Sequence, residues 1–126
     1  VTSRRTSNVV KKILIEKLKN FAKIWIGDGK NPYIKSIQES SYFIVTSDST
    51  SMISEAAISG KPIYVHHLTF KRNSKRIENF HREFSDLGIT KDLINFNHLS
   101  EWTYNSLNES ERIAIIIKKR IIKENI

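Results

Sequence analysis

The 126-residue sequence contains no cysteine. Disulfide bonds, thiol nucleophiles and cysteine-based metal sites are therefore excluded. A reducing compartment such as the cytoplasm is the natural expectation, with a peripheral position at a membrane as the alternative. No apolar run approaches the roughly 18 residues that a membrane-spanning helix needs, and no signal-peptide pattern is visible.

Acidic residues are also few, because 13 Asp and Glu against 21 Lys and Arg give a formal net charge of +8. Such a charge can indicate nucleic acid or an anionic membrane surface as a partner. No basic run interleaves with aromatic residues, however, and no zinc-finger or helix-turn-helix signature is present, so no specific nucleic-acid partner is expected. An anionic membrane surface stays a candidate partner, and a solvated basic surface is the simpler interpretation.

What the sequence does contain is an ordinary globular composition, with 39% hydrophobic and 27% charged residues. This composition and the chain length predict one domain over residues 1–126. The chain begins at Val1, and Val1–Ser3 resembles the end of a strand that enters a loop. We therefore expect a fragment whose missing part is N-terminal.

The most informative stretch runs from Tyr42 to His67. Tyr42–Val45 is a continuous apolar run, typical of a parallel strand that is covered on both faces. Apolar residues then follow at helical spacing over Met52–Ala57, and Gly60 ends that pattern. A second apolar run begins at Ile63. The stretch therefore predicts strand, loop, helix and strand.

Five small polar residues, Ser47–Ser51, form the loop between the first strand and the helix. In a parallel unit the free N–H groups of such a helix point out of the carboxyl edge of the sheet, which predicts an anion-binding site beside the hydroxyls of Ser49, Thr50 and Ser51. Glu55 follows about one turn into the helix, by the ~3.6-residue repeat, where a carboxylate can accept hydrogen bonds from a sugar diol. The alternative is that the hydroxyls only cap the helix and Glu55 only favours its positive end.

The N-terminal residues offer a second group of anion-binding candidates. Arg4 and Arg5 lie between the predicted strand end and a helix from about Asn8 to Asn20, and their planar guanidinium groups suit bidentate binding of a diphosphate. A surface arginine pair without a ligand is the alternative. Ala22–Ile26 predicts a further strand, and a short helix opens at Asn31–Tyr33.

The C-terminal half is predicted to be helical in two places. Apolar residues at 3.6-residue spacing predict a helix that ends at Gly88, and a final helix is expected from about Asn108. Leu93–Phe96 is predicted as an edge strand. The alternation of strands and helices indicates the α/β class, a Rossmann-like three-layer αβα domain with a mostly parallel sheet.

Histidines give no metal site in this interpretation. His66 and His67 are neighbours on a strand and point to opposite faces, so they are poor joint ligands for one metal ion. His81 lies among the apolar residues of its helix and is more typical of a packing histidine.

Several motifs together resemble a known family. SRRT at Ser3–Thr6, NPY at Asn31–Tyr33, TSDSTSMISEAAISGKP at Thr46–Pro62 and KRIENFHREFSDLG at Lys75–Gly88 are similar to the mitochondrial-fission (elongated mitochondria) family. Thr46–Pro62 also resembles the nucleotide-sugar-binding half of GT-B glycosyltransferases, especially the lipid II type. The resemblance implies a C-terminal GT-B half whose N-terminal GT-B domain is absent.

The resemblance also implies roles for individual residues. Ser49, Thr50 and Ser51 would bind the diphosphate, and Glu55 would bind the ribose. Asn31 and Tyr33 would contact the base, with helix capping by Asn31 and packing of Tyr33 as the alternative. Many retaining GT-B enzymes carry a second Glu where this chain has Ser47, so the inverting, lipid-linked branch is the better match.

Two functions follow as hypotheses. In the first, the chain binds a nucleoside diphosphate or nucleotide sugar as a ligand, with no cofactor and no metal, and the full-length protein transfers the sugar by electrostatic stabilisation of the leaving diphosphate. The acceptor-activating base would come from the missing half, so the fragment alone would bind without turnover. In the second, the chain is a non-catalytic GT-B-derived interaction or adaptor module.

Overall fold

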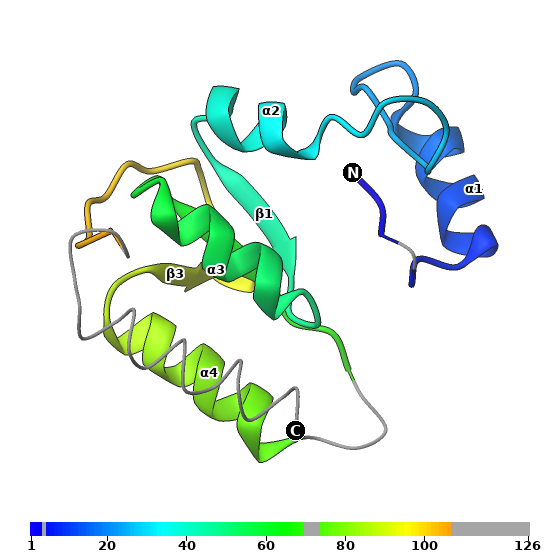
Figure 1. Ribbon diagram of the computed structural model, residues 1–126. Coiled ribbons are helices and arrows are strands. Elements are labelled where there is room, and N and C mark those ends of the chain that lie inside the picture. The colour runs from blue at the N-terminus through cyan, green and yellow to red at the C-terminus, as the bar shows by residue number, and fades with distance from the viewer. Residues whose placement is uncertain (4, 70–73, 107–126) are drawn as a thin grey trace. The chain divides into compact units, whose positions relative to one another are not determined.

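The computed structural model describes residues 1–3, 5–69 and 74–106. It divides the chain into two compact units, Val1–Glu39 and Ser40–Ile126 (Figure 1). The second unit holds a three-stranded, all-parallel open sheet, so the α/β class predicted from the sequence is confirmed. The expectation of one domain over residues 1–126 stays a prediction, and the helix expected from about Asn108 lies outside the described residues.

The first unit contains helices α1, Asn8–Leu18, and α2, Tyr33–Glu39. Ser7 caps α1, because its side chain accepts a hydrogen bond from the Val10 amide. The strands predicted at Val1–Ser3 and Ala22–Ile26 are not formed in the described part of this unit. Instead, the Thr2 amide and hydroxyl both donate to the Trp25 carbonyl, at 3.1 and 3.0 Å. A pair of strands needs hydrogen bonds at several successive residues, and here both bonds go to one carbonyl. The segments around Thr2 and Trp25 therefore remain irregular.

The sheet of the second unit consists of β1, Phe43–Thr46, β2, Ile63–His66, and β3, Thr90–Asp92, in the order β1-β2-β3. Helices α3, Thr50–Ile58, and α4, Lys75–Asp86, form the two crossovers. The strand–loop–helix–strand prediction for Tyr42–His67 is therefore confirmed. Gly60 and Gly88 follow the two helices at φ +74° each, a left-handed conformation that favours glycine over residues with a Cβ.

One core joins the two helices to the sheet. Consecutive parallel strands with right-handed crossovers place both connecting helices on the same face, and here α3 and α4 share one cluster of buried side chains. Phe80 and Phe84 stack at 4.2 Å between ring centroids. The buried members of this cluster are Ile53, Ala56, Ala57, Ile63, Val65, Phe80, Phe84 and Ile89.

The other face of β2 is covered by the segment that follows β3. Tyr64 meets the rings of Phe96 and Trp102 edge-on, at 5.5 and 5.2 Å. The edge strand predicted at Leu93–Phe96 is wrong in position, because the strand is Thr90–Asp92 and Leu93–Asn95 forms the 3-10 helix η1. The register explains the shift, since Thr90 lies opposite Ile63 and the paired stretch ends at Asp92 opposite Val65.

Candidate functional site

The three strands end at the same edge of the sheet, because they are parallel. The loop from β1 to α3 begins there with Ser47, the segment after β2 begins with His67, and η1 follows Asp92 at the end of β3. In open α/β sheets, ligands bind at the carboxyl ends of the strands. This edge is therefore where the candidate site is built.

Ser47 connects two of these loops. It is 2% exposed, its amide donates to the His66 carbonyl at 2.9 Å, and its hydroxyl accepts from the Leu68 amide at 2.9 Å. Its carbonyl lies 2.8 Å from Nε2 of His81 on α4. Ser47 thus connects the β1–α3 loop, the segment after β2, and α4.

The start of α3 presents unpaired donors. Ser49 is the N-cap residue, but its side chain makes no capping hydrogen bond. Within the described residues, the amides of Thr50, Ser51 and Met52 have no acceptor, and the first amide of this turn that is satisfied is that of Ile53, which donates to the Ser49 carbonyl at 3.0 Å. This helix start therefore has the free N–H groups that an anion needs.

The hydroxyl groups of this loop differ in accessibility. Ser49 is 9% exposed, Thr50 is half-buried, and Ser51 is exposed. Glu55 is exposed on α3, about one turn after Ser51, by the ~3.6-residue repeat. Thr50 and Ser51 are consequently the hydroxyls that a ligand can reach with the least rearrangement.

The structure also assembles a cluster that the sequence did not predict. Nε2 of His67 lies 2.8 Å from Oδ1 of Asp92, and the His67 and His81 rings meet edge-on at 5.0 Å. The His81 ring is half-buried, and burial lowers its pKa, with the charge of His67 as a weaker contribution in the same direction. Because a carbonyl only accepts hydrogen bonds, Nε2 of His81 carries the hydrogen and donates it to the Ser47 carbonyl.

No sequence signal could have identified this cluster. Asp92 lies 25 residues from His67 in the chain, and only the pairing of β2 with β3 brings the two together. Within the described part of the chain, no group of three or more His, Asp or Glu side chains is placed to hold a metal ion.

The remaining predicted residues belong to the first unit. Arg5 and Asn31 are exposed, Tyr33 is half-buried, and Arg4 lies outside the described residues. Oδ1 of Asn31 accepts a hydrogen bond from the Tyr33 amide at 3.0 Å, so Asn31 caps α2, which was the alternative for this residue. The structure therefore brings together the candidates on α3, while the candidates from Arg4 to Tyr33 lie in the other unit.

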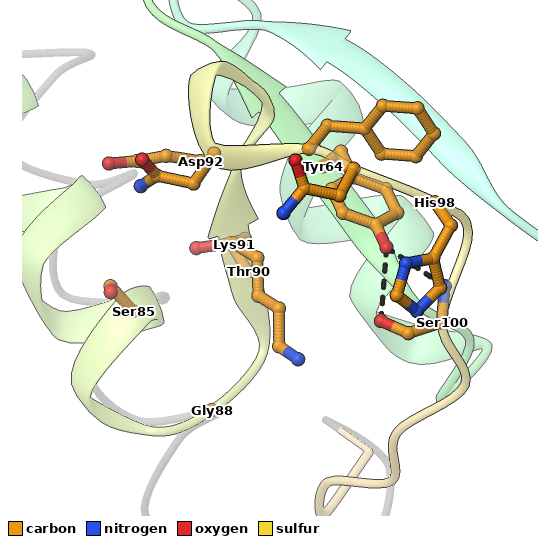
Figure 2. A pocket seen from close by; sticks show the side chains of 11 residues that line it. Tyr64, Ser85, Gly88, Thr90, Lys91, Asp92, His98 and Ser100 are labelled. Atoms are coloured by element: carbon orange, nitrogen blue, oxygen red, sulfur yellow. Dashed lines mark hydrogen bonds between the residues drawn. The ribbon is translucent and has the colours of Figure 1, made fainter.

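A cavity of about 460 Å³ lies elsewhere in the second unit (Figure 2). Figure 2 shows Ser85 and Gly88 on one side of it, His98 and Ser100 on the other, and Lys91 between them. The Tyr64 hydroxyl is hydrogen-bonded to the Ser100 hydroxyl at 3.2 Å, which lowers the pKa of Tyr64. Asp92 lines this cavity, but none of the residues predicted to bind a diphosphate, ribose or base does so.

Among the described residues, no helix has the length and apolar character required to cross a membrane.

Comparison with known proteins gives the family. The chain matches the family model described as Mitochondrial fission ELM1 over residues 1–121. It is 31% identical over 125 residues to "Mitochondrial fission protein ELM1" of Arabidopsis thaliana, covering 94% of this chain and 28% of the relative. It is 36% identical over 124 residues to "Uncharacterized protein RP120" of Rickettsia prowazekii (strain Madrid E), covering 92% of this chain and 34% of the relative.

No solved structure matches the chain significantly. The chain spans about a third of the length of these curated relatives. The family model nevertheless covers nearly all of the 126 residues, and the resemblance to the mitochondrial-fission family noted in the sequence is confirmed. This chain therefore belongs to the mitochondrial fission ELM1 family.

Proposed function

We propose that this chain is the nucleotide-sugar-binding domain of a GT-B-like member of its family. The diphosphate would lie at the start of α3, against Thr50, Ser51 and the helix amides, with Ser49 behind them. Glu55 would accept hydrogen bonds from the ribose hydroxyls. Arg4 and Arg5 would neutralise charge on the diphosphate, and Asn31 and Tyr33 would contact the base.

One observation carries this proposal. The first three amides of α3 have no acceptor among the described residues, and they open at the carboxyl edge of a parallel sheet. An N-cap serine that does not cap leaves this place open to an external acceptor. Phosphate oxygens fit this place, because the helix dipole adds about half a positive charge to the donated hydrogen bonds.

The position of Glu55 agrees with this arrangement. Because Glu55 follows the three amides by about one turn, its backbone lies about one helical pitch, ~5.4 Å, along the helix axis from them. A ribose attached to the diphosphate bridges a distance of this order. The carboxylate would then accept hydrogen bonds from the diol and not oppose the phosphate directly.

The test is calorimetric titration of the chain with UDP, ADP and GDP. We expect at least one nucleoside diphosphate to bind weakly, with a Kd of about 0.1 to 1 mM, since an open single-domain site buries only part of the ligand. Glu55→Ala should weaken that binding about 5- to 10-fold, because losing a hydrogen bond to a charged group at an exposed site costs about 1 to 1.4 kcal/mol.

Glu16→Ala is the matched control, because Glu16 is also an exposed glutamate on a helix but lies on α1, outside the proposed ligand contacts. It should leave the affinity unchanged. Equal affinities for the wild type and Glu55→Ala would remove the ribose role, and absence of binding for all three nucleotides would overturn the proposal.

The name of the plant relative favours a second candidate. The Arabidopsis protein is called a mitochondrial fission protein, which describes a process and not a transfer reaction. A non-catalytic interaction or adaptor module would retain the α/β scaffold without a nucleotide, and its basic charge of +8 would suit an anionic membrane surface. Co-sedimentation with vesicles of an anionic lipid, in a chain that binds no nucleotide, would support this alternative.

A further inference from the structure

The cavity of about 460 Å³ in the second unit has no role in the proposed nucleotide site. It lies between the end of α4 and the segment 95–100, and β3 runs along it (Figure 2). Its volume is within the range of about 300 to 1,000 Å³ that small-molecule sites occupy. Tyr64 and Phe96 add aromatic surface to a lining that is largely polar. A cavity of this size and polarity suits a small polar molecule.

Lys91 gives the cavity a positive charge that no carboxylate neutralises. Its ammonium lies 4.4 Å from the centroid of the Trp102 ring, and it makes no ion pair among the described residues. The described lining contains one carboxylate, that of Asp92, and its Oδ1 is already bonded to His67 at 2.8 Å. A cation without a carboxylate partner attracts anions to the cavity that it lines. The charge of the cavity therefore favours a ligand with a negative group.

Contacts of Trp102 fix the position of this ammonium. Nε1 of Trp102 donates to the Gly88 carbonyl at 2.9 Å, and the indole meets the Tyr64 ring edge-on at 5.2 Å. The face of an indole ring attracts a cation without neutralising it. Lys91 is therefore held at the cavity with its charge still available to a ligand.

Ser100 supplies a hydroxyl group near Lys91. The Tyr64 hydroxyl is hydrogen-bonded to the Ser100 hydroxyl at 3.2 Å and accepts from the Ser100 amide at 3.1 Å. These bonds lower the pKa of Tyr64, and the charge of Lys91 makes a smaller contribution in the same direction, so the ammonium lies close to this pair of hydroxyls. An ammonium and a hydroxyl in one place are donors that suit a phosphate group.

The rest of the lining suits sugar hydroxyls. Asn95 and Asn97 carry amides that both donate and accept hydrogen bonds, and Ser85 carries a hydroxyl with the same two capacities. Hydroxyl groups of a sugar also donate and accept, so they can pair with each of these residues. The Phe96 side chain is 41% exposed and offers apolar surface to the C–H groups of a sugar ring.

We propose that this cavity binds a sugar phosphate, with the phosphate at Lys91 and Ser100 and the sugar hydroxyls against Ser85, Asn95 and Asn97. The inference goes beyond the proposed function, because no residue assigned there to the diphosphate, ribose or base lines the cavity. The two sites can therefore be tested independently.

The experiment titrates the whole chain with glucose 6-phosphate, glucose and inorganic phosphate at about pH 7.5, where a phosphate monoester carries nearly two negative charges. Binding is followed by NMR through the indole N–H resonances. The chain has two tryptophans, so the variant Trp25→Phe assigns both signals. The Trp102 signal reports on the cavity, because its indole lies under the Lys91 ammonium.

Lys91→Met tests the charge, because methionine keeps an apolar stem over Trp102 and removes the ammonium. Lys91→Gln is a second uncharged variant, and the two should give the same result. Lys61→Met is the matched control. Lys61 also lies over an aromatic ring in the same unit, that of Phe43 at 5.9 Å, but it does not line the cavity.

We expect glucose 6-phosphate to shift the Trp102 signal with a Kd of about 1 mM or below, since an open site buries only part of a small ligand. Glucose and inorganic phosphate should bind at least about fivefold more weakly, because each lacks part of the contacts. Lys91→Met should raise the Kd for glucose 6-phosphate about tenfold, because a charge-assisted hydrogen bond is lost. Lys61→Met should leave this Kd unchanged.

Four results would each overturn this inference. They are no shift of the Trp102 signal up to about 20 mM glucose 6-phosphate, equal binding of glucose or of inorganic phosphate, an unchanged Kd in both Lys91 variants, and an equal loss in Lys61→Met. None of them depends on the binding of UDP, so the proposed function would stand. Conversely, a chain that binds glucose 6-phosphate as expected but no nucleoside diphosphate would retain this inference and lose the proposed function.

Discussion

Ser47→Ala is the substitution that most directly tests how the carboxyl edge is built. The Ser47 hydroxyl is 2% exposed and accepts a hydrogen bond from the Leu68 amide at 2.9 Å. Alanine removes the acceptor and leaves that amide unpaired. A partly buried donor without a partner costs about 1 to 3 kcal/mol, and because Leu68 is 38% exposed, water can reach the region and the lower end of that range applies.

The expected loss in the free energy of unfolding is therefore about 1 to 1.5 kcal/mol. Urea denaturation, followed by circular dichroism, measures it. With a denaturant slope of about 1.5 kcal/mol per molar urea, the midpoint should fall by about 0.7 to 1 M with an unchanged slope. The hydrogen exchange of the Leu68 amide should also become faster, since its protecting bond is lost.

Ser54→Ala is the control for this substitution. The Ser54 hydroxyl donates to the Thr50 carbonyl within α3, so its removal leaves no amide without an acceptor. Alanine is also the better helix former. Its midpoint should stay close to that of the wild type. A midpoint for Ser47→Ala within about 0.2 M of the wild type would refute the view that Ser47 ties the two loops together.

Two further predictions concern the core and the pH dependence of the second unit. Phe84 is 1% exposed and stacks on Phe80, so Phe84→Ala should lose about 3 to 5 kcal/mol in urea denaturation, whereas Phe21→Ala, at a residue 85% exposed, should lose less than about 0.5 kcal/mol. Burial lowers the pKa of His81 below its usual value of 6.5, so the unfolded chain binds a proton at a higher pH than the folded chain does. The free energy of unfolding is therefore unaffected by His81 above about pH 6.5 and decreases as the pH falls toward the lower folded-state pKa. The urea midpoint should therefore drop between about pH 7.5 and about pH 5.5, and it should drop less in His81→Gln; equal drops would contradict the assignment.

The sequence predicted the segment from β1 to β2 because its signals are local. An apolar run, a group of small polar residues, a helical period and a glycine with φ +74° each act within a few residues of the chain. The end of α4 at Gly88 was predicted for the same reason. The serine-rich loop could likewise be recognised as a helix start, although the sequence alone could not say that Ser49 leaves its cap unmade.

β3 shows where local signals are insufficient. Leu93–Phe96 is the more apolar run, yet the strand is Thr90–Asp92. Its position is set by pairing with Ile63–Val65, which lie 27 residues earlier in the chain. Pairing energy depends on the partner strand, and no property of the segment by itself records it.

The sequence by itself determined the α/β class, the glycines at which α3 and α4 end, and the loop at which an anion could bind, because each depends on residues that are neighbours in the chain. Only the tertiary structure decided that Ser47 joins two loops and that His67 meets Asp92 and His81. Those contacts arise because parallel strands end at one edge of the sheet, so side chains far apart in sequence are brought within hydrogen-bonding distance there.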